Sequence, residues 1–286
     1  MLFRSDEAAL ELAGAVAGAH VRVEKPFTGR SNLFSETAGV LVVDAERLDR
    51  VNDIDERVTI ATLPPFKTVE PGEMVGTVKI IPFAVPGAAL DACVAEARKG
   101  TMEVRPFRPL KVGVVSTLLP GLKPTVVAKT LRVLEGRLAP ARATIARETR
   151  VTHETVALSA AIRDLLPACD LIVVFGASAI TDRRDVIPAA IELAGGRIEH
   201  FGMPVDPGNL LLIGSFGAGE AKKTVLGAPG CARSPKENGF DWVLHRLLAG
   251  IEVTGRDIKR MGAGGLLMEI VQRGQLREGE IGRAHV

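Results

Sequence analysis

Two nearly continuous apolar runs in the second half of the chain constrain its fold more than any other feature. They occupy residues 111–117 and 169–175, and neither alternates polar with apolar residues as a half-buried strand would. Such runs are typical of strands that helices cover on both faces, as in a parallel sheet. Segments with helical spacing follow both runs, so we predict alternating strands and helices joined by right-handed crossovers.

The alternation predicts one α/β domain over residues 105–250, with a mostly parallel sheet in a three-layer arrangement. Two more strands are expected, at 143–148 and 224–228. Helices are expected at 123–138, 154–166, 185–194 and 238–248.

The chain before this region follows a different pattern and predicts a smaller α+β or barrel-like domain over residues 6–104. Strand-like runs at 39–43, 58–63 and 74–81 are separated by Pro and Gly pairs, and helices are expected at 7–19, 44–51 and 88–98. Pro106 and Pro109 block regular structure and mark the linker. We assign residues 251–279 to a C-terminal extension.

Both ends of the chain resemble translated sequencing-adapter DNA, at residues 1–5 and 280–286. We therefore expect an open reading frame truncated at both ends, and neither stretch enters the fold prediction. An ordinary polar terminus is the alternative. Coding DNA that continues a natural gene through both ends would refute the truncation.

Charge and composition exclude several classes of protein. The formal net charge is +2, from 36 basic and 34 acidic residues, and aromatics are 4% with no Tyr, which argues against nucleic-acid binding. No apolar run reaches the roughly 18 residues of a membrane span. The three cysteines are far apart and form no CxxC pair, which favours a reducing, cytoplasmic compartment without zinc or redox chemistry. The five histidines form no ligand-spaced set, so we expect them to be exposed or structural.

Ligands of an open parallel sheet bind beyond the carboxyl ends of its strands, so the loops there matter most. The loop at 176–188 follows the clearest strand. Gly176 lets backbone approach a ligand, and Ser178 and Thr181 offer hydroxyl groups. The loop leads into a helix N-terminus, which favours an anion, and Arg183 and Arg184 add donors for phosphate or carboxylate.

The same loop carries two carboxylates. Asp182 and Asp185 have the oxygen ligands that a divalent cation prefers, or they cap the following helix. An ordinary strand–helix turn with Asp caps is therefore the alternative to a binding loop.

Two further loops have suitable compositions. In the loop at 228–238, Gly230 gives backbone access and Arg233, Ser234 and Lys236 are donors of the kind that bind phosphate. Cys231 in this loop has no His nearby in the sequence, so we do not expect a nucleophile. The loop at 203–209 is a stiff Pro- and Gly-rich turn, for which a plain surface turn is an equally good interpretation.

Nucleotide-binding signatures are absent from the expected places. No GxGxxG follows the first strand of the α/β region, which disfavours a dinucleotide-binding domain. Residues 214–222 come close to a P-loop, but the Lys does not follow the second Gly, and the segment is better explained as the tip of a hairpin.

Taken together, the loops resemble the molybdopterin-binding domain of molybdenum-cofactor biosynthesis proteins of the MoaB/Mog and MoeA type, over about residues 109–250. That family places a Gly-Gly-Thr/Ser-Gly turn after a central strand and then Arg-Asp-Val-Thr-Pro. Here residues 174–179 (Val-Phe-Gly-Ala-Ser-Ala) occupy the turn and 184–188 (Arg-Asp-Val-Ile-Pro) the second motif. The family's Pro-Gly loop corresponds to residues 229–231, and the Pro-Gly segment of MoeA-type members to 203–209.

The chain departs from the family pattern at several positions. Ala177 and Ala179 replace two turn glycines, and one extra residue precedes Asp185. Where the family often has Thr-Gly-Asp-Glu after the first strand, this chain has Ser-Thr-Leu-Leu at 116–119, which removes acidic residues that help to hold magnesium. The sequence looks most like a divergent bacterial subgroup in which this domain precedes a cofactor nucleotidyltransferase domain, which truncation would remove.

The resemblance implies a phosphate site and a reaction. The terminal phosphate of molybdopterin would sit on backbone N–H groups near Ser178 and Gly230, and Arg184, Arg233 and Lys236 would neutralise it. Asp185 would coordinate magnesium or position the attacking phosphate, with Asp182 as a second catalytic candidate. The other implied cofactor-binding residues are Gly176, Thr181 and Ser234. The chemistry would be adenylyl transfer from ATP, or phosphate hydrolysis coupled to molybdate insertion. We also expect a homo-oligomer.

Three hypotheses follow from the sequence. The first is a catalytic domain of cofactor biosynthesis. The second is a non-catalytic module that presents molybdopterin to another domain, which the missing acidic pair favours. The third is an unrelated α/β enzyme that acts on another phosphorylated metabolite.

Overall fold

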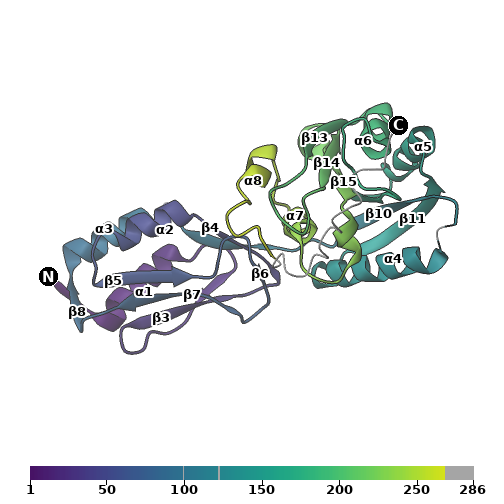
Figure 1. Cartoon of the computed structure of the whole chain (residues 1–286). Coiled ribbons are helices and arrows are strands. Elements are labelled where there is room, and N and C mark those ends of the chain that lie inside the picture. The colour runs from purple at the N-terminus through teal and green to yellow at the C-terminus, as the bar shows by residue number, and fades with distance from the viewer. Residues whose placement is uncertain (99, 122, 268–286) are drawn as a thin grey trace, which may run out of the picture.

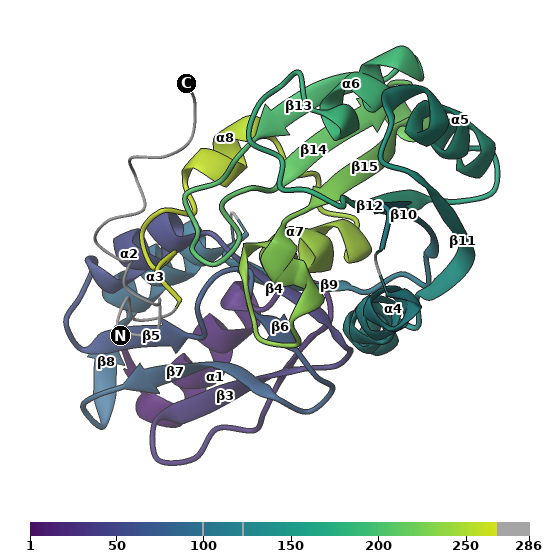
Figure 2. The same ribbon diagram turned by 45° about the vertical axis from the view of Figure 1, so that its right-hand side comes forward.

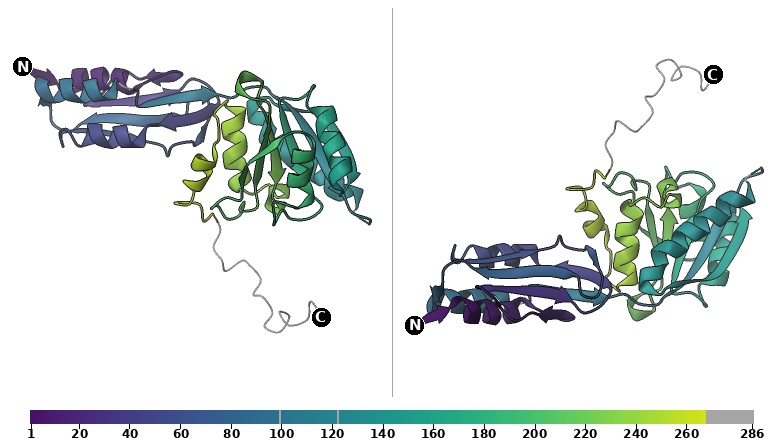
Figure 3. Two further views of the ribbon diagram at one scale, coloured as in Figure 1. Left: turned by 90° about the horizontal axis from the view of Figure 1, so that it is seen from above. Right: turned by 90° about the horizontal axis from the view of Figure 1, so that it is seen from below.

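The computed structural model describes residues 1–98, 100–121 and 123–267, and they form two lobes (Figure 1). The two lobes lie end to end along the long dimension of the molecule (Figure 3). The expected C-terminal extension is described as far as residue 267. Its remainder and the stretch at 280–286 lie outside the described residues.

The first lobe is an α+β arrangement of three helices and several antiparallel sheets. The helices are α1 (Ser5–Val16), α2 (Ala45–Asn52) and α3 (Gly87–Ala97). A four-stranded sheet has the order β2 (Val21–Val23), β3 (Arg30–Ser35), β7 (Met74–Ile80), β5 (Val58–Thr62). A three-stranded sheet has the order β6 (Thr68–Val69), β4 (Gly39–Val43), β9 (Met102–Pro106), and β1 (Leu2–Arg4) pairs with β8 (Ala84–Pro86).

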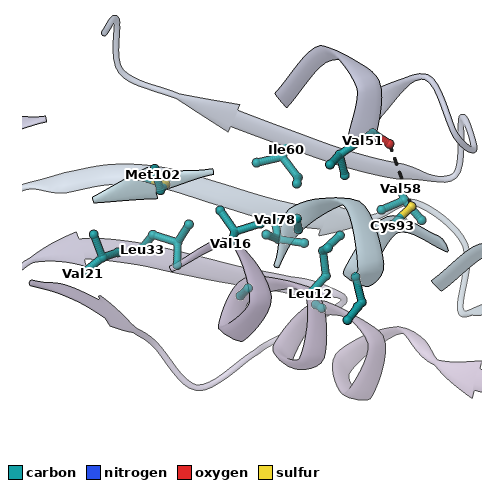
Figure 4. Close-up of a cluster of buried hydrophobic side chains, with 14 of the residues drawn as sticks. Leu12, Val16, Val21, Leu33, Val51, Val58, Ile60, Val78, Cys93 and Met102 are labelled. Atoms are coloured by element: carbon teal, nitrogen blue, oxygen red, sulfur yellow. Dashed lines mark hydrogen bonds between the residues drawn. The ribbon is translucent and has the colours of Figure 1, made fainter. Parts of the chain in front are cut away.

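One apolar core holds this lobe together. Leu12 and Val16 of α1 pack there with Leu33, Ile60 and side chains from the other helices and strands (Figure 4). The inward residues alternate with outward ones along β5, as expected for a sheet with one buried face. Cys93 is also buried in this core, and its burial raises the pKa of the thiol to about 11, so it is a packing residue.

The strands β4, β5 and β7 were predicted, whereas β1, β2, β3, β6, β8 and β9 were not, and β3 shows why. Its inward positions are Ser31, Leu33 and Ser35, so two of the three buried residues are polar. The Ser31 hydroxyl donates to the Glu24 carbonyl at 2.8 Å, which allows a polar residue in the core. The predicted linker also begins later than expected, because β9 continues to Pro106 at the edge of its sheet. Residues 2–4, left out of the prediction, form β1.

The second lobe is built on one mixed six-stranded sheet. Its order is β11 (Thr144–Thr152), β10 (Lys111–Leu118), β12 (Leu171–Phe175), β15 (Lys223–Ala228), β14 (Leu212–Phe216), β13 (Arg197–Phe201). The first four strands are parallel, and β14 is antiparallel to both of its neighbours. The segment that came close to a P-loop joins β14 to β15, as the hairpin interpretation predicted.

Helices pack against both faces of this sheet (Figure 2). The α-helices are α4 (Pro124–Leu138), α5 (Thr155–Leu165), α6 (Val186–Leu193), α7 (Gly239–Leu248) and α8 (Gly255–Lys259); the 3-10 turns are η1 (Ala139–Ala141), η2 (Gly219–Ala221) and η3 (Gly230–Arg233). Along β12, Val173 and Phe175 share a core with α4 and α7, whereas Ile172 and Val174 share one with α5 and α6. All five residues of β12 are buried, which is why this run is continuously apolar.

The parallel strands bring their carboxyl ends to one edge of the sheet. Phe175, the last residue of β12, pairs with Ala228, the last residue of β15. The loops at 176–188 and 228–238 therefore leave neighbouring strands at the same level. Within the described ranges, no helix has both the length and the apolar character that crossing a membrane requires.

Candidate functional site

Arg233 joins the two predicted loops. Its Nη2 donates to the carbonyl oxygen of Gly176 at 2.8 Å, and its guanidinium lies 5.3 Å from the centroid of the Phe175 ring. Its Nη1 donates to the Thr130 hydroxyl of α4 at 3.1 Å. Burial lowers the pKa of Arg233 from its usual value, although a guanidinium stays charged at neutral pH. The loops at 176–188 and 228–238 therefore share one site, with part of the Arg233 donor capacity used to hold them together.

The loop at 228–238 is shaped by Arg137, which the sequence analysis missed. Arg137 lies at the end of α4, forms a buried ion pair with Asp241, and donates to the carbonyl oxygens of Ala232 and Ser234 at 2.7 and 2.8 Å. A buried charge is tolerated only when it is paired and hydrogen-bonded, and these contacts satisfy that need. Arg137 fixes the path of the backbone that carries Arg233, Ser234 and Lys236.

The same loop ends in a capping box that the sequence does contain. The Asn238 side chain accepts from the Phe240 N–H at 3.1 Å, and the Asp241 carboxylate accepts from the Asn238 N–H at 2.9 Å. A polar residue followed three positions later by an acidic one is a known sign of a helix start. That pattern could have identified Asp241 as a structural residue, although the sequence analysis did not use it, and the pairing with Arg137 had no signal in the sequence.

The two predicted glycines differ in what surrounds them. A Cβ atom added at Gly176 would lie 2.8 Å from the carbonyl oxygen of Ser178 and from Ile187 Cδ1, so the fold itself requires glycine there. A Cβ atom added at Gly230 would meet nothing within 4 Å. Gly230 is also exposed, so the space beside its backbone is open to a ligand.

The carboxylates of the loop at 176–188 bind the loop itself. Asp185 Oδ2 accepts from the N–H groups of Thr181 and Asp182, at 2.6 and 2.9 Å, and these bonds lower the pKa of Asp185. Asp182 Oδ1 accepts from the backbone N–H and Nε of Arg184, at 2.7 and 3.0 Å, which lowers the pKa of Asp182. Both are ionised at neutral pH, and both act as turn residues within the loop. The predicted helix cap is wrong, because Asp185 stands at the N-cap position of α6 but its side chain makes no capping hydrogen bond.

A preformed metal centre is not found in the part of the chain that the structure describes, where no three His, Cys, Asp or Glu side chains gather as ligands. A magnesium site often has fewer protein ligands than this, because Mg²⁺ binds one or two carboxylates together with phosphate oxygens and water. Oδ1 of Asp185 accepts no hydrogen bond from the described residues and keeps that capacity.

Two cations of these loops are exposed. Arg183 and Lys236 are exposed, and neither forms an ion pair with any residue in the described ranges. Arg184 differs, because its guanidinium pairs with Asp182. Lys236 therefore remains for an anion, in addition to the partly used Arg233, whereas Arg183 lies within electrostatic reach of His200 on β13.

A buried hydroxyl at the same edge lacks a partner. Ser116 is 3% exposed, and its Oγ has no hydrogen-bond partner among the described atoms. It pairs in register with Phe175, whose ring lies against Arg233. The Oγ atom is itself buried, so a ligand at the two loops does not reach it directly.

A hydrogen-bonded chain adds residues of two more strands to the site. The Ala177 N–H donates to Thr117 Oγ1 at 2.8 Å, and Thr117 Oγ1 lies 2.8 Å from His153 Nδ1. The other ring nitrogen, Nε2, lies 2.8 Å from Ser178 Oγ. His153 is the satisfied structural residue that the sequence analysis expected, but its connection to Ser178 was not foreseen. Thr117 and His153 are 36 residues apart, so no spacing rule could link them.

The loop at 203–209 is not a surface turn. Met203 and Val205 are buried in the core beneath α7, and the Pro207 carbonyl accepts from the Gly239 N–H at 2.8 Å. Gly208 has a φ of 136°, and a Cβ atom there would lie 2.6 Å from the nitrogen of Gly239. The loop supports the start of α7, and so indirectly the loop at 228–238.

A cavity of about 520 Å³ lies at the opposite, amino edge of the sheet. Residues at or next to the beginnings of β10, β12 and β15 contribute to its walls, and its polar lining residues are Arg108, Asp170, Glu199, Ser215, Lys222, Thr224 and Glu252. Lys222 Nζ pairs with Glu252 at 3.0 Å, and Arg197 beside it pairs with Glu199 at 2.8 Å. Its size suits a small molecule, but none of the residues predicted from the sequence lines it.

Comparison with known proteins gives only distant structural matches. No family model matches the chain, and no curated protein matches it. The structure is similar to a molybdopterin biosynthesis MoeA protein from Pyrococcus horikosii, with a TM-score of 0.37 and 17% identity over 90% of this chain and 76% of that one. It is also similar to a molybdenum cofactor biosynthesis protein from Pyrococcus furiosus, with a TM-score of 0.30 and 16% identity over 88% of this chain and 71% of that one. Likeness this weak does not establish a family.

Proposed function

We propose that the carboxyl edge of the second lobe binds molybdopterin through its terminal phosphate, and that the protein acts in molybdenum-cofactor biosynthesis. One observation carries the proposal: Arg233 of one loop donates to the Gly176 carbonyl of the other at 2.8 Å. The resemblance noted in the sequence requires these loops to grip a single anionic group. Loops on opposite sides of the molecule would have ended the proposal.

The phosphate would occupy the open space beside Gly230, where no side chain is needed for the fold. Backbone N–H groups near Ser178 and Gly230 are donors for it, and Lys236 supplies an exposed positive charge. Thr181 and Ser234 offer further hydroxyl contacts, and Arg184 stabilises the loop through Asp182. Binding by fixed backbone donors suits a phosphate because it costs little reorganisation.

Magnesium, where it is used, would neutralise charge on the phosphate and on ATP. Asp185 is the residue that would hold it, because Oδ1 is not committed to the loop. Asp182 is committed to Arg184, which leaves it a positioning role in the loop at 176–188. The chain's own contribution is therefore to orient the phosphate rather than to supply a nucleophile.

Whether the domain catalyses a step is a separate part of the proposal. β10 ends at Leu118 and is followed by Leu119, so no carboxylate follows the strand beside β12. Asp185 alone then serves the metal, which favours a module that presents molybdopterin to a nucleotidyltransferase domain over a complete adenylyltransferase. Such a domain, and a second copy of this chain, are the partners that we propose.

Binding of molybdopterin to the purified chain tests this function, with the pterin's fluorescence as the signal. The expected result is saturable one-to-one binding that Gly230→Val weakens. Incubation with Mg-ATP then separates the two forms of the proposal: adenylylated product supports a catalytic domain, and binding without product supports a presenting module. Absence of binding by the unchanged chain would reject both.

A further inference from the structure

The hydrogen bonds that run from Thr117 through His153 to Ser178 have a defined donor-to-acceptor direction. It follows from the acceptors that are available to each hydrogen. Thr117 is 1% exposed, and its Oγ1 already accepts the Ala177 N–H at 2.8 Å. The hydrogen of this buried hydroxyl needs an acceptor, because an unmade bond would cost free energy. Within the described ranges, His153 Nδ1 at 2.8 Å is the acceptor that the structure offers it.

If Thr117 donates to Nδ1, that nitrogen carries no hydrogen, and the neutral ring carries its hydrogen on Nε2. The Nε2–H group then donates to Ser178 Oγ at 2.8 Å. Ser178 accepts this bond, so its own hydrogen is directed away from the imidazole. Since Ser178 is exposed, that hydrogen is available to a ligand.

This direction excludes serine-hydrolase chemistry, which a hydrogen-bonded series of Thr, His and Ser otherwise suggests. In a serine hydrolase the histidine accepts the serine proton, which requires a lone pair on the nitrogen that faces the serine. Here the nitrogen that faces Ser178 carries hydrogen, because Thr117 occupies the other one. Ser178 is therefore a hydrogen-bond donor and not an activated nucleophile.

We propose that Thr117 and His153 are positioning residues that hold Ser178 as a donor to an anionic oxygen of a phosphate monoester. The inference rests on the proposed function for the place of the phosphate, beside Gly230 and Lys236. It adds the atom that recognises the phosphate from the loop at 176–188 and the two residues that orient it. Neither Thr117 nor His153 needs to touch the ligand.

The test combines a measurement of the ring tautomer with phosphate binding to the full chain. Two-bond ¹H–¹⁵N correlation spectra of histidine-labelled protein report which ring nitrogen carries hydrogen, and the His153 signals are those absent from His153→Gln. Inorganic phosphate is then titrated into the unchanged chain and the variants. The expected tautomer is Nε2–H in the unchanged chain, with loss of that single form in Thr117→Val.

Conservative variants distinguish a role in positioning Ser178 from a role in folding alone. Ser178→Ala removes the donor and should weaken phosphate binding about tenfold, since bonds to charged groups are worth roughly 1.5–3 kcal/mol. Thr117→Val and His153→Asn should weaken phosphate binding similarly, because each removes one of the hydrogen bonds that join Thr117, His153 and Ser178. Thr117→Ser keeps the hydroxyl and His153→Gln keeps an N–H that reaches Ser178, so both should stay within about threefold of the unchanged chain.

The outcomes distinguish this inference from the proposed function. An Nδ1–H tautomer, no phosphate binding by the unchanged chain, or unaltered phosphate binding by Ser178→Ala would overturn the inference. Because Ser178 is exposed, its variant tests the inference even if Thr117→Val fails to fold. Phosphate binding that depends on Ser178 and His153, in a chain that does not bind molybdopterin, would reject the proposed function and leave the inference standing.

Discussion

The two edges of the second lobe's sheet are built for different purposes. At the amino edge there is a cavity of about 520 Å³, and two of its charged lining residues, Lys222 and Glu252, form an ion pair. At the carboxyl edge the loops leave Arg183 and Lys236 without ion pairs among the described residues, and Ser116 without a hydrogen-bond partner. The loop at 228–238 also borders a cavity of about 590 Å³ through Pro235. What distinguishes the carboxyl edge is the contact between its two loops through Arg233 and Gly176.

We therefore place the proposed anion site by the contact between the two loops rather than by cavity volume. A parallel sheet directs the N-termini of the following helices toward the carboxyl edge, where their N–H groups need acceptors. At the amino edge, Lys222 pairs with Glu252 and Arg197 with Glu199. Five predictions test this contrast, in order of expected effect.

The largest effect is expected from Arg137→Ala. This change leaves Asp241 buried without its partner and frees the carbonyl oxygens of Ala232 and Ser234. The free energy of unfolding should fall by about 3–5 kcal/mol. Urea denaturation measures it, with Lys222→Met at the amino edge as the control, for which the loss should be at most about 1 kcal/mol. Equal losses would mean that the two edges are held in the same way.

Asp185→Asn tests the metal role at the carboxyl edge. If the chain turns over Mg-ATP, the rate should fall at least about a hundredfold, because a metal ligand is lost. Molybdopterin affinity should stay within about threefold, as the contacts to the pterin phosphate are unchanged. Glu199→Gln makes the same chemical change at the amino edge and should leave the rate unaltered. Unchanged turnover in Asp185→Asn would show that Asp185 does not bind the metal.

Gly230→Val should weaken molybdopterin binding at least about tenfold, because its side chain fills the space for the phosphate. The thermal midpoint should not move, since a Cβ atom at this position meets nothing within 4 Å. The contrasting variant is Gly176→Val, whose Cβ would lie 2.8 Å from the Ser178 carbonyl oxygen, so it should lose about 1–3 kcal/mol of stability. Normal affinity in Gly230→Val contradicts the placement of the phosphate.

Acidification should loosen the loop at 176–188. Hydrogen bonds from backbone N–H groups hold the pKa of Asp185 below its unfolded value of about 3.9. The stabilisation is therefore complete above that value and disappears as the pH falls through the lower, folded pKa. The amide resonance of Thr181 should shift below about pH 4, and Asp185→Asn should abolish that shift, whereas the Asp182 amide also reports the titration of its own carboxylate. Resonances that titrate at higher pH would contradict the assigned bonds.

The smallest effect is expected from Lys222→Met. Because the cavity at the amino edge takes no part in the proposed site, the dissociation constant for molybdopterin should change less than about twofold. Fluorescence titration measures this change. A tenfold loss of affinity would indicate that the ligand binds at the amino edge. It would favour the third hypothesis, an unrelated α/β enzyme that acts on another phosphorylated metabolite.

Several parts of the fold and of the site could be predicted from local pattern. The run at 169–175 forms β12 because both of its faces are covered, and the predicted helices of the second lobe begin and end within two residues of the observed ones. Ser178 and Gly230 were candidates because strand ends followed by glycine-bearing loops are recognisable without tertiary information. The antiparallel β14 and β13 were missed, since their short runs lie between Pro- and Gly-rich segments.

The supporting residues could not be predicted in the same way. Arg137 sits on an amphipathic helix where a basic residue normally faces water, and its partner Asp241 is 104 residues away. His153 had no ligand-spaced neighbour, because Thr117 and Ser178 come from other strand ends. Such pairs become visible only when the sheet places their strands side by side.

The sequence by itself determined which segments are strands buried on both faces, which loops follow them, and which residues in those loops can donate to an anion. These are local properties, set by side-chain periodicity and backbone chemistry. Only the tertiary structure decided that Arg233 meets Gly176, 57 residues earlier, and that His153 faces Ser178. The register between β12 and β15 fixes the first contact, and the order of β11, β10 and β12 fixes the second. Strand register and order come from packing of the whole sheet, which no single segment encodes.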